Sequence, residues 1–157
     1  GNHEDRIRRS TSIDVVGALA ESLGLSHLHF PDGATLKITF GRNSKGRRAA
    51  FTVYHTHGRG GGALQGAKVL RMARMSTVVL ADVYIASHTH FKVAFKESLW
   101  VPDLYNNKMR LVEQTFVNSA ALLDWGGYAQ IQGYKPGALG SPHITLIPDP
   151  KEVRVTL

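Results

Sequence analysis

Two apolar runs in this sequence each end on a His-x-His pair, and this pattern limits the fold more than any other feature. The first run is "AAFTVYHTH" at 49–57, and the second is "VVLADVYIASHTH" at 78–90. Short apolar runs of this kind predict strands. In an α/β fold the loops at strand ends converge on one crevice, so we expect the paired histidines to belong to a functional site.

The spacing within each pair favours metal binding. In an extended chain, residues i and i+2 point to the same side, so His55 and His57 share a face, as do His88 and His90. Two neutral imidazoles on one face suit a divalent transition metal. A single such pair is more often an exposed or packing feature. Two pairs, together with a further histidine in "GNHE" at 1–4, favour a metal site.

Composition sets the broad class. The chain has 157 residues, 43% of them hydrophobic, which predicts one globular domain over 1–157. A formal net charge of +7 favours anionic partners, although such a balance more often serves solubility. Because there is no cysteine, a metal must be held by His, Asn, Asp or Glu, and a cytoplasmic location is expected. No apolar run reaches the length of about 20 residues that a membrane span needs.

The remaining pattern predicts a mixed α/β chain that finishes in a β-rich half. A helix is expected at 10–25, with Ser12 as its N-cap and Gly24 at its end. A strand at 34–41, with Leu36, Ile38 and Phe40 on one face, is expected to pair with 49–57 across the charged turn at 41–48. A glycine-rich loop at 58–66 precedes a helix at 67–76. Further strands are expected at 82–86, 91–101, 108–118, 143–149 and 152–157.

Three motifs together resemble a known family. The segments "GNHE" at 1–4, "HG" at 57–58 and "SHTH" at 87–90 are similar, in this order, to the last three motifs of the calcineurin-like metallophosphoesterase superfamily. The tail "YAQIQGYKPGALGSPHITLI" resembles phage- and prophage-encoded members. The resemblance implies a layered α/β/β/α sandwich that hydrolyses phosphate mono- or diesters, nucleic acid among them, in a bacterial or phage-infected cell. It also implies two divalent ions, Mn²⁺ foremost, with Fe, Zn, Ni or Mg as alternatives.

The resemblance assigns roles to the motif residues. Asn2, through its amide oxygen, His57 and His88 would bind the second metal, and His90 would bind the first. His3 would be catalytic, placed beside the phosphate to stabilise or protonate the leaving oxygen.

Three further residues are expected around this centre. Glu4 is expected to orient His3 or its loop. His55 is the main rival of His57, as a ligand or as a substrate contact. Arg59, in the glycine-rich loop, is a candidate for contact with the substrate phosphate.

The sequence departs from the family in two ways. Ser87 stands where the family usually has glycine, and the first two motifs, D-x-H and G-D-x-x-D, do not occur. We therefore expect this chain to be the C-terminal part of the domain, without its N-terminal strands, and to need a complementing N-terminal segment or a homo-oligomer for full activity. The alternative is a catalytically inactive fragment, or a partner-dependent module that binds metal or nucleic acid.

Overall fold

The computed structural model describes residues 1–157 except 43–45, 47, 61, 63 and 123, and except the side chain of Tyr128. It has mixed α/β content, as the sequence predicts, and divides into two compact units. The N-terminal unit covers Gly1–Ala34 and the C-terminal unit covers Thr35–Leu157.

The N-terminal unit is helical. It contains α1 (Asn2–Thr11), α2 (Val15–Ser22) and the short 3-10 helix η1 (Ser26–Leu28). The predicted cap at Ser12 is wrong, because Ser12 has a left-handed backbone (φ 60°) and closes α1. The N-cap of α2 is Asp14, whose side chain accepts a hydrogen bond of 2.9 Å from the Gly17 N–H.

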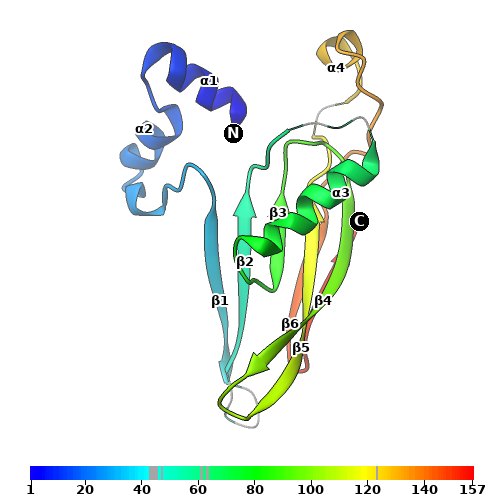
Figure 1. Cartoon of the computed structure of the whole chain (residues 1–157). Helices are drawn as coiled ribbons and strands as arrows, with labels where there is room; N and C mark the ends of the chain where they lie inside the picture. The colour runs from blue at the N-terminus through cyan, green and yellow to red at the C-terminus, as the bar shows by residue number, and fades with distance from the viewer. Residues whose placement is uncertain (43–45, 47, 61, 63, 123) are drawn as a thin grey trace. The chain divides into compact units, whose positions relative to one another are not determined.

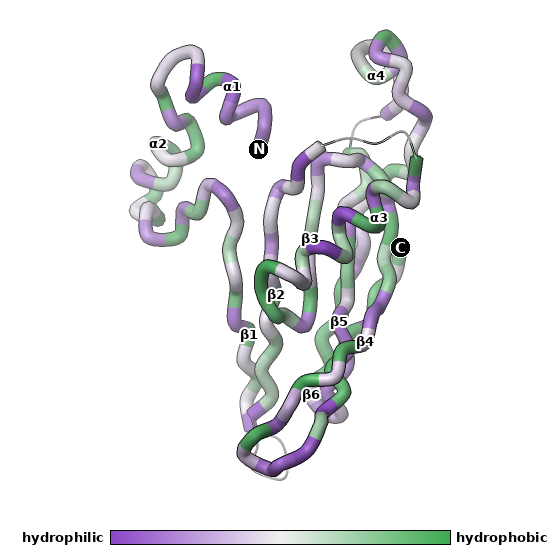
Figure 2. The backbone as a smooth tube through the Cα atoms, in the orientation of Figure 1, coloured by the Kyte–Doolittle hydropathy of each residue, from purple (hydrophilic) through white to green (hydrophobic). Residues whose placement is uncertain are grey.

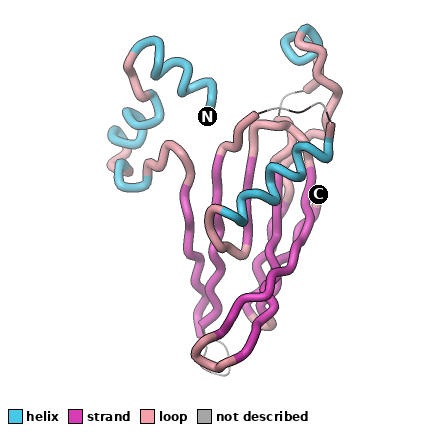
Figure 3. The backbone as a smooth tube through the Cα atoms, in the orientation of Figure 1, coloured by secondary structure: helices cyan, strands magenta, loops and turns pink. Residues whose placement is uncertain are grey.

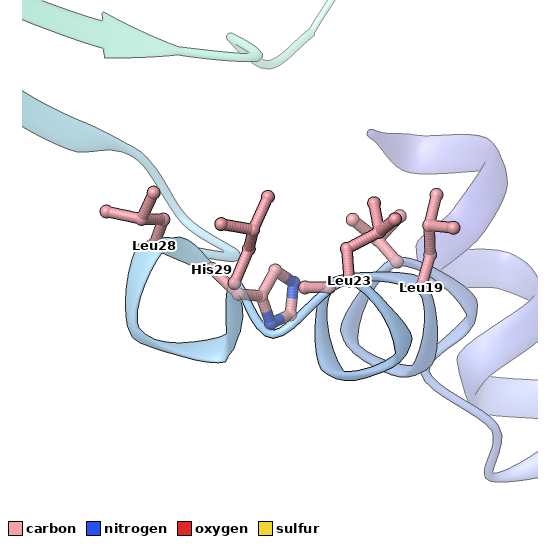
Figure 4. A pocket seen from close by; sticks show the side chains of 7 residues that line it. Leu19, Leu23, Leu28 and His29 are labelled. Atoms are coloured by element: carbon pink, nitrogen blue, oxygen red, sulfur yellow. The ribbon is translucent and has the colours of Figure 1, made fainter.

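This unit has an apolar surface and no fully buried residue. Helix α1 is almost wholly hydrophilic (Figure 2), whereas α2 and the segment after it bring several leucines together. A cavity of about 250 Å³ results, and Figure 4 shows Leu19, Leu23, Leu28 and His29 around it. With so little burial, packing inside the unit contributes little to its stability.

The C-terminal unit is built on a five-stranded mixed sheet (Figure 1). The strand order is β1-β2-β3-β5-β4, in which β2, β3 and β5 run parallel and β4 runs antiparallel to β5. Helix α3 connects β2 to β3, and the 3-10 helix η2 follows it (Figure 3). A separate hairpin is formed by β6 and β7. The bounds of these elements are β1 (Ala34–Arg42), β2 (Arg48–Thr56), α3 (Gln65–Ala73), η2 (Arg74–Thr77), β3 (Val83–Ala86), β4 (Val93–Asp103), β5 (Lys108–Asn118), α4 (Gly127–Ile131), β6 (His143–Pro148) and β7 (Lys151–Thr156).

Alternation along the strands gives the sheet two packed faces. On one face, Met72 of α3 lies against a stack of aromatic rings in which Tyr84 and Phe116 have centroids 4.6 Å apart, and Phe116 and Phe95 have centroids 4.8 Å apart. On the other face, Phe51 and the strand valines pack against the β6–β7 hairpin. That second cluster comprises Phe51, Val53, Val83 and Val153, with Ile144 and Leu146 beside them.

In the C-terminal unit the expected strands agree with the structure, although α4 was not expected. The single helix expected at 10–25 is wrong, because this part of the chain forms the end of α1 and, separately, α2. The predicted strands at 82–86 and 108–118 are found as β3 and β5, and the helix expected at 67–76 is found as α3 with η2. Leu36, Ile38 and Phe40 lie in β1 as expected, but of the three only Phe40 packs against the second cluster. The predicted turn at 41–48 and loop at 58–66 lie partly outside the described residues. Within the described part of the chain, no helix is long and apolar enough to cross a membrane.

Candidate metal centre

The predicted histidines of the C-terminal unit follow two neighbouring parallel strands. Strand β2 ends at Thr56, directly before His57, and β3 ends at Ala86, two residues before His88. Because β2 and β3 are paired in parallel, with Thr56 opposite Ala86, their carboxyl ends lie at the same edge of the sheet. This is the edge at which open α/β sheets place ligand sites.

The structure brings His57 and His88 together. Their ring centroids lie 5.1 Å apart with an interplanar angle of 64°, and both side chains are half-buried. Two imidazoles that share one ion at metal–nitrogen distances of about 2.1 Å and tetrahedral angles have centroids about 5 Å apart. The observed separation therefore fits two ligands of one transition-metal ion. Neutral nitrogen donors suit Zn²⁺, Fe²⁺ or Ni²⁺ better than Mg²⁺ and Mn²⁺, which prefer oxygen ligands.

The residue after His57 has to be glycine for a local reason. Gly58 has a φ of 84°, and a Cβ atom there would lie 3.3 Å from the Ser87 carbonyl oxygen. The Ser87 N–H in turn donates a 3.2 Å hydrogen bond to the His57 carbonyl, so the two histidine loops run side by side. Ser87 is not among the described residues with a positive φ, and serine in place of the family's glycine therefore brings no such strain.

The other two histidines of the pairs do not complete a cluster. His55 lies within β2, opposite Ile85, and is exposed, and His90 is exposed as well. Among the described residues, no group of three or more His, Cys, Asp or Glu side chains is placed to hold a metal. Of the two candidates in the first pair, His57 is the one that lies against another histidine, which favours it over His55 as a ligand.

Asn2 and His3 lie in the N-terminal unit, where both belong to the first turn of α1. Glu4 lies in the same turn. The roles expected for Asn2, His3 and Glu4 stay predictions, and the centre described for the C-terminal unit rests on the residues of that unit alone.

The carboxylate closest in sequence to the second histidine pair is that of Asp82. Asp82 directly precedes β3, so it lies at the end of that strand opposite His88. Its carboxylate is already used, because it accepts hydrogen bonds from the Thr52 N–H at 2.7 Å and from the Lys151 ammonium at 2.7 Å. Asp82 therefore joins the β6–β7 hairpin to the sheet and does not serve as a metal bridge.

Four cationic residues lie in the histidine loops, next to them in sequence, or in contact with them. Arg59 follows Gly58 and is exposed, and Lys92 lies two residues beyond His90. On α3, Lys68 donates to the Thr89 carbonyl at 3.1 Å and Arg71 donates to the Arg59 carbonyl at 2.9 Å. None of these four cations forms an ion pair with an acid of the described residues, so their charge is available to an anion at this edge.

Arg59 was named from the sequence as a candidate contact, whereas Lys68 and Arg71, which the structure places beside the same loops, were not named. The available signal was their spacing of three residues in a helix that follows a glycine-rich loop, which places both on one helix face. The spacing alone does not show that this face of α3 contacts the two histidine loops.

Comparison of the chain with protein-family models, with curated proteins and with solved structures finds no match. The family resemblance of the three motifs therefore stays a prediction, and functional inference depends on the geometry of the centre.

Proposed function

We propose that the C-terminal unit carries part of the active site of a metal-dependent phosphoesterase. The observation that carries this proposal is the His57–His88 pair, 5.1 Å between centroids, at the carboxyl edge of two adjacent parallel strands. Two half-buried imidazoles held face to edge are a donor set for a transition-metal ion.

The packing of the unit supports the finer fold assignment that we propose with it. Helix α3, the five-stranded sheet and the β6–β7 hairpin form three successive layers, because the first cluster joins α3 to one face and the second joins the hairpin to the other. An α/β/β/α sandwich contains a succession of this kind. The proposed assignment is therefore a metallophosphoesterase-like sandwich.

In this proposal the histidines of the unit bind the metal and its cationic residues bind the substrate. His57 and His88 hold the ion, which supplies Lewis-acid polarisation of a phosphoryl oxygen. Arg59 and Lys92, and the α3 cations Lys68 and Arg71, attract the phosphate ester and offset its negative charge. Arg71 and Lys68 are fixed by carbonyl oxygens and keep further N–H donors for substrate, since a guanidinium has five and an ammonium three.

The rival proposal is a module that binds a metal without catalysis. It is favoured by the donor set itself, because two neutral ligands without a carboxylate are a weak site for a pair of divalent cations, whose mutual repulsion a bridging carboxylate offsets. Under this proposal the pair would bind one ion, and the cations would bind nucleic acid or another anion.

One assay separates the two proposals. Hydrolysis of a chromogenic phosphodiester by the purified full chain is measured with and without Mn²⁺, for the unchanged sequence and for His57→Ala, His88→Ala and His143→Ala. His143 is an exposed histidine at the start of β6 and serves as the control. Because the unit carries only part of the active site, we expect weak Mn²⁺-dependent turnover, which both loop variants abolish and the control retains. Metal binding without turnover would support the module, and turnover unaffected by His88→Ala would contradict both proposals.

A further inference from the structure

The residue between His88 and His90 is held by hydrogen bonds on every side. The Thr89 N–H donates to the Ser87 carbonyl at 2.7 Å, and the Thr89 carbonyl accepts from the Lys68 ammonium at 3.1 Å. Its hydroxyl oxygen accepts a 2.8 Å bond from the Asn118 amide nitrogen. All three polar atoms of the central residue are therefore bonded, and the bonds come from its own loop, from α3 and from β5.

Asn118 makes the more extensive of these contacts. It is the last residue of β5 and is only 1% exposed. Its amide nitrogen donates a second hydrogen bond, of 2.6 Å, to the Phe91 carbonyl, so the Asn118 side chain is bonded to the residues on both sides of His90. A carbonyl oxygen can only accept, which fixes the amide orientation with nitrogen toward Phe91. Among the described residues the amide oxygen, which is buried, has no hydrogen-bond partner.

The turn needs such support because of its backbone. His88 has a φ of 66° and His90 a φ of 49°, both in the left-handed region that a residue with a Cβ atom seldom adopts. Unfavourable conformations of this kind persist where the surrounding contacts over-determine them, and they concentrate at functional sites. Asn118 supplies two of those contacts from inside the sheet.

We propose that Asn118 is a positioning residue for the metal centre: it fixes the Thr89 turn and so holds the His88 imidazole against His57. This inference rests on the proposed function. Its amide contacts the turn that carries the ligand and not the ligand itself, so its effect is on the geometry and affinity of the centre. Partners that hydrogen-bond a ligand directly change metal affinity by about 10- to 100-fold when they are lost, and this range is the upper limit for a residue that holds the turn instead.

Two pairs of variants test the proposal. Asn118→Ala and Thr89→Val remove the same hydrogen bond from its two ends, and Thr89→Val keeps the side-chain shape at a half-buried position, so folding is retained. Thr89→Ser keeps the hydroxyl and should restore binding. Thr115→Val is the matched control, because Thr115 lies in β5 with Asn118, is 1% exposed and has a buried hydroxyl without a partner among the described residues.

The measurement is the absorption spectrum of the full chain titrated with Co²⁺, after circular dichroism has established that each variant is folded. We expect weaker Co²⁺ binding, with about 10- to 100-fold as the upper limit, and shifted visible bands for Asn118→Ala and Thr89→Val, with the control unchanged. Unchanged affinity and bands in both loss variants would overturn the positioning role while leaving the metal centre intact. Absence of any Co²⁺ spectrum for the unchanged sequence would overturn the metal centre itself.

Discussion

The contact between Asp82 and the β6–β7 hairpin provides a quantitative test of the fold. The Asp82 side chain is 16% exposed, and one of its oxygens accepts from both the N–H and the hydroxyl of Thr52, at 2.7 and 3.0 Å. Its other oxygen accepts from the Lys151 ammonium at 2.7 Å. The carboxylate thus satisfies the Thr52 N–H within β2 and joins the β6–β7 hairpin to the sheet.

The two partners of this ion pair are expected to differ in importance. Asp82→Ala removes charge-assisted hydrogen bonds worth about 1.5–3 kcal/mol and leaves the Thr52 N–H without its partner, so we expect a loss of about 3 kcal/mol in the free energy of unfolding. Lys151 is 47% exposed, and its ion pair is worth at most about 1 kcal/mol. Its ammonium also lies 5.0 Å from the centroid of the Phe51 ring, which adds about 0.5–1 kcal/mol. Lys151→Ala should therefore cost about 1 to 2 kcal/mol.

Urea denaturation followed by circular dichroism measures the free energy of unfolding of both variants, and the two values can be compared if the m value is unchanged. Asp82→Asn is the intermediate case, since it keeps an oxygen for the Thr52 N–H and loses the charge that faces Lys151. Equal losses for Asp82→Ala and Lys151→Ala, or a loss below about 1 kcal/mol for Asp82→Ala, would refute the reasoning. Because Asp82 lies at the end of β3 opposite His88, metal affinity should be the same in all three variants.

Three further variants test the core, the histidine loop and a helix cap. Burial raises the pKa of the Tyr84 hydroxyl, so this group ionises first in the unfolded chain, and the free energy of unfolding falls as the pH rises above about 10. Tyr84→Phe should flatten this alkaline dependence in urea unfolding measured over a series of pH values. An unchanged slope would contradict the prediction. Gly58→Ala should destabilise by about 1–2 kcal/mol because of its positive φ, whereas the control Gly66→Ala, in open space within α3, should stabilise by about 0.5–1 kcal/mol in thermal unfolding. Asp14→Ala should weaken α2 by about 1 kcal/mol and shift the Gly17 amide resonance, and an unshifted resonance would count against the cap.

The elements of the C-terminal unit could be predicted from sequence because their patterns are local. β5 was expected at 108–118 and is found over those residues, since its apolar residues and the turn before it determine both ends. The helix boundary at Ser12 was predicted wrongly because Ser12 and Asp14 are both good capping residues, and only the structure shows that the chain adopts a left-handed turn between two helices.

The centre was predictable in part, for a physical reason. The strand-end positions of His57 and His88 follow from the apolar runs that precede them, but the pairing of His57 rather than His55 with His88 depends on where β2 ends. Asn118 could not be found from sequence. It lies 28 residues after His90, and its two bonds to the turn exist only because β5 is paired with β3.

The proposed metal centre requires that His57 and His88 bind one divalent ion together. A Zn²⁺ titration of the full chain with ¹⁵N-labelled histidine, followed through the ring nitrogen resonances by NMR, tests this requirement. We expect the resonances of the His57 and His88 rings to change together and to saturate at the same zinc concentration, while the exposed His143 ring does not respond. If the two rings responded independently, or if neither responded, His57 and His88 would not share an ion.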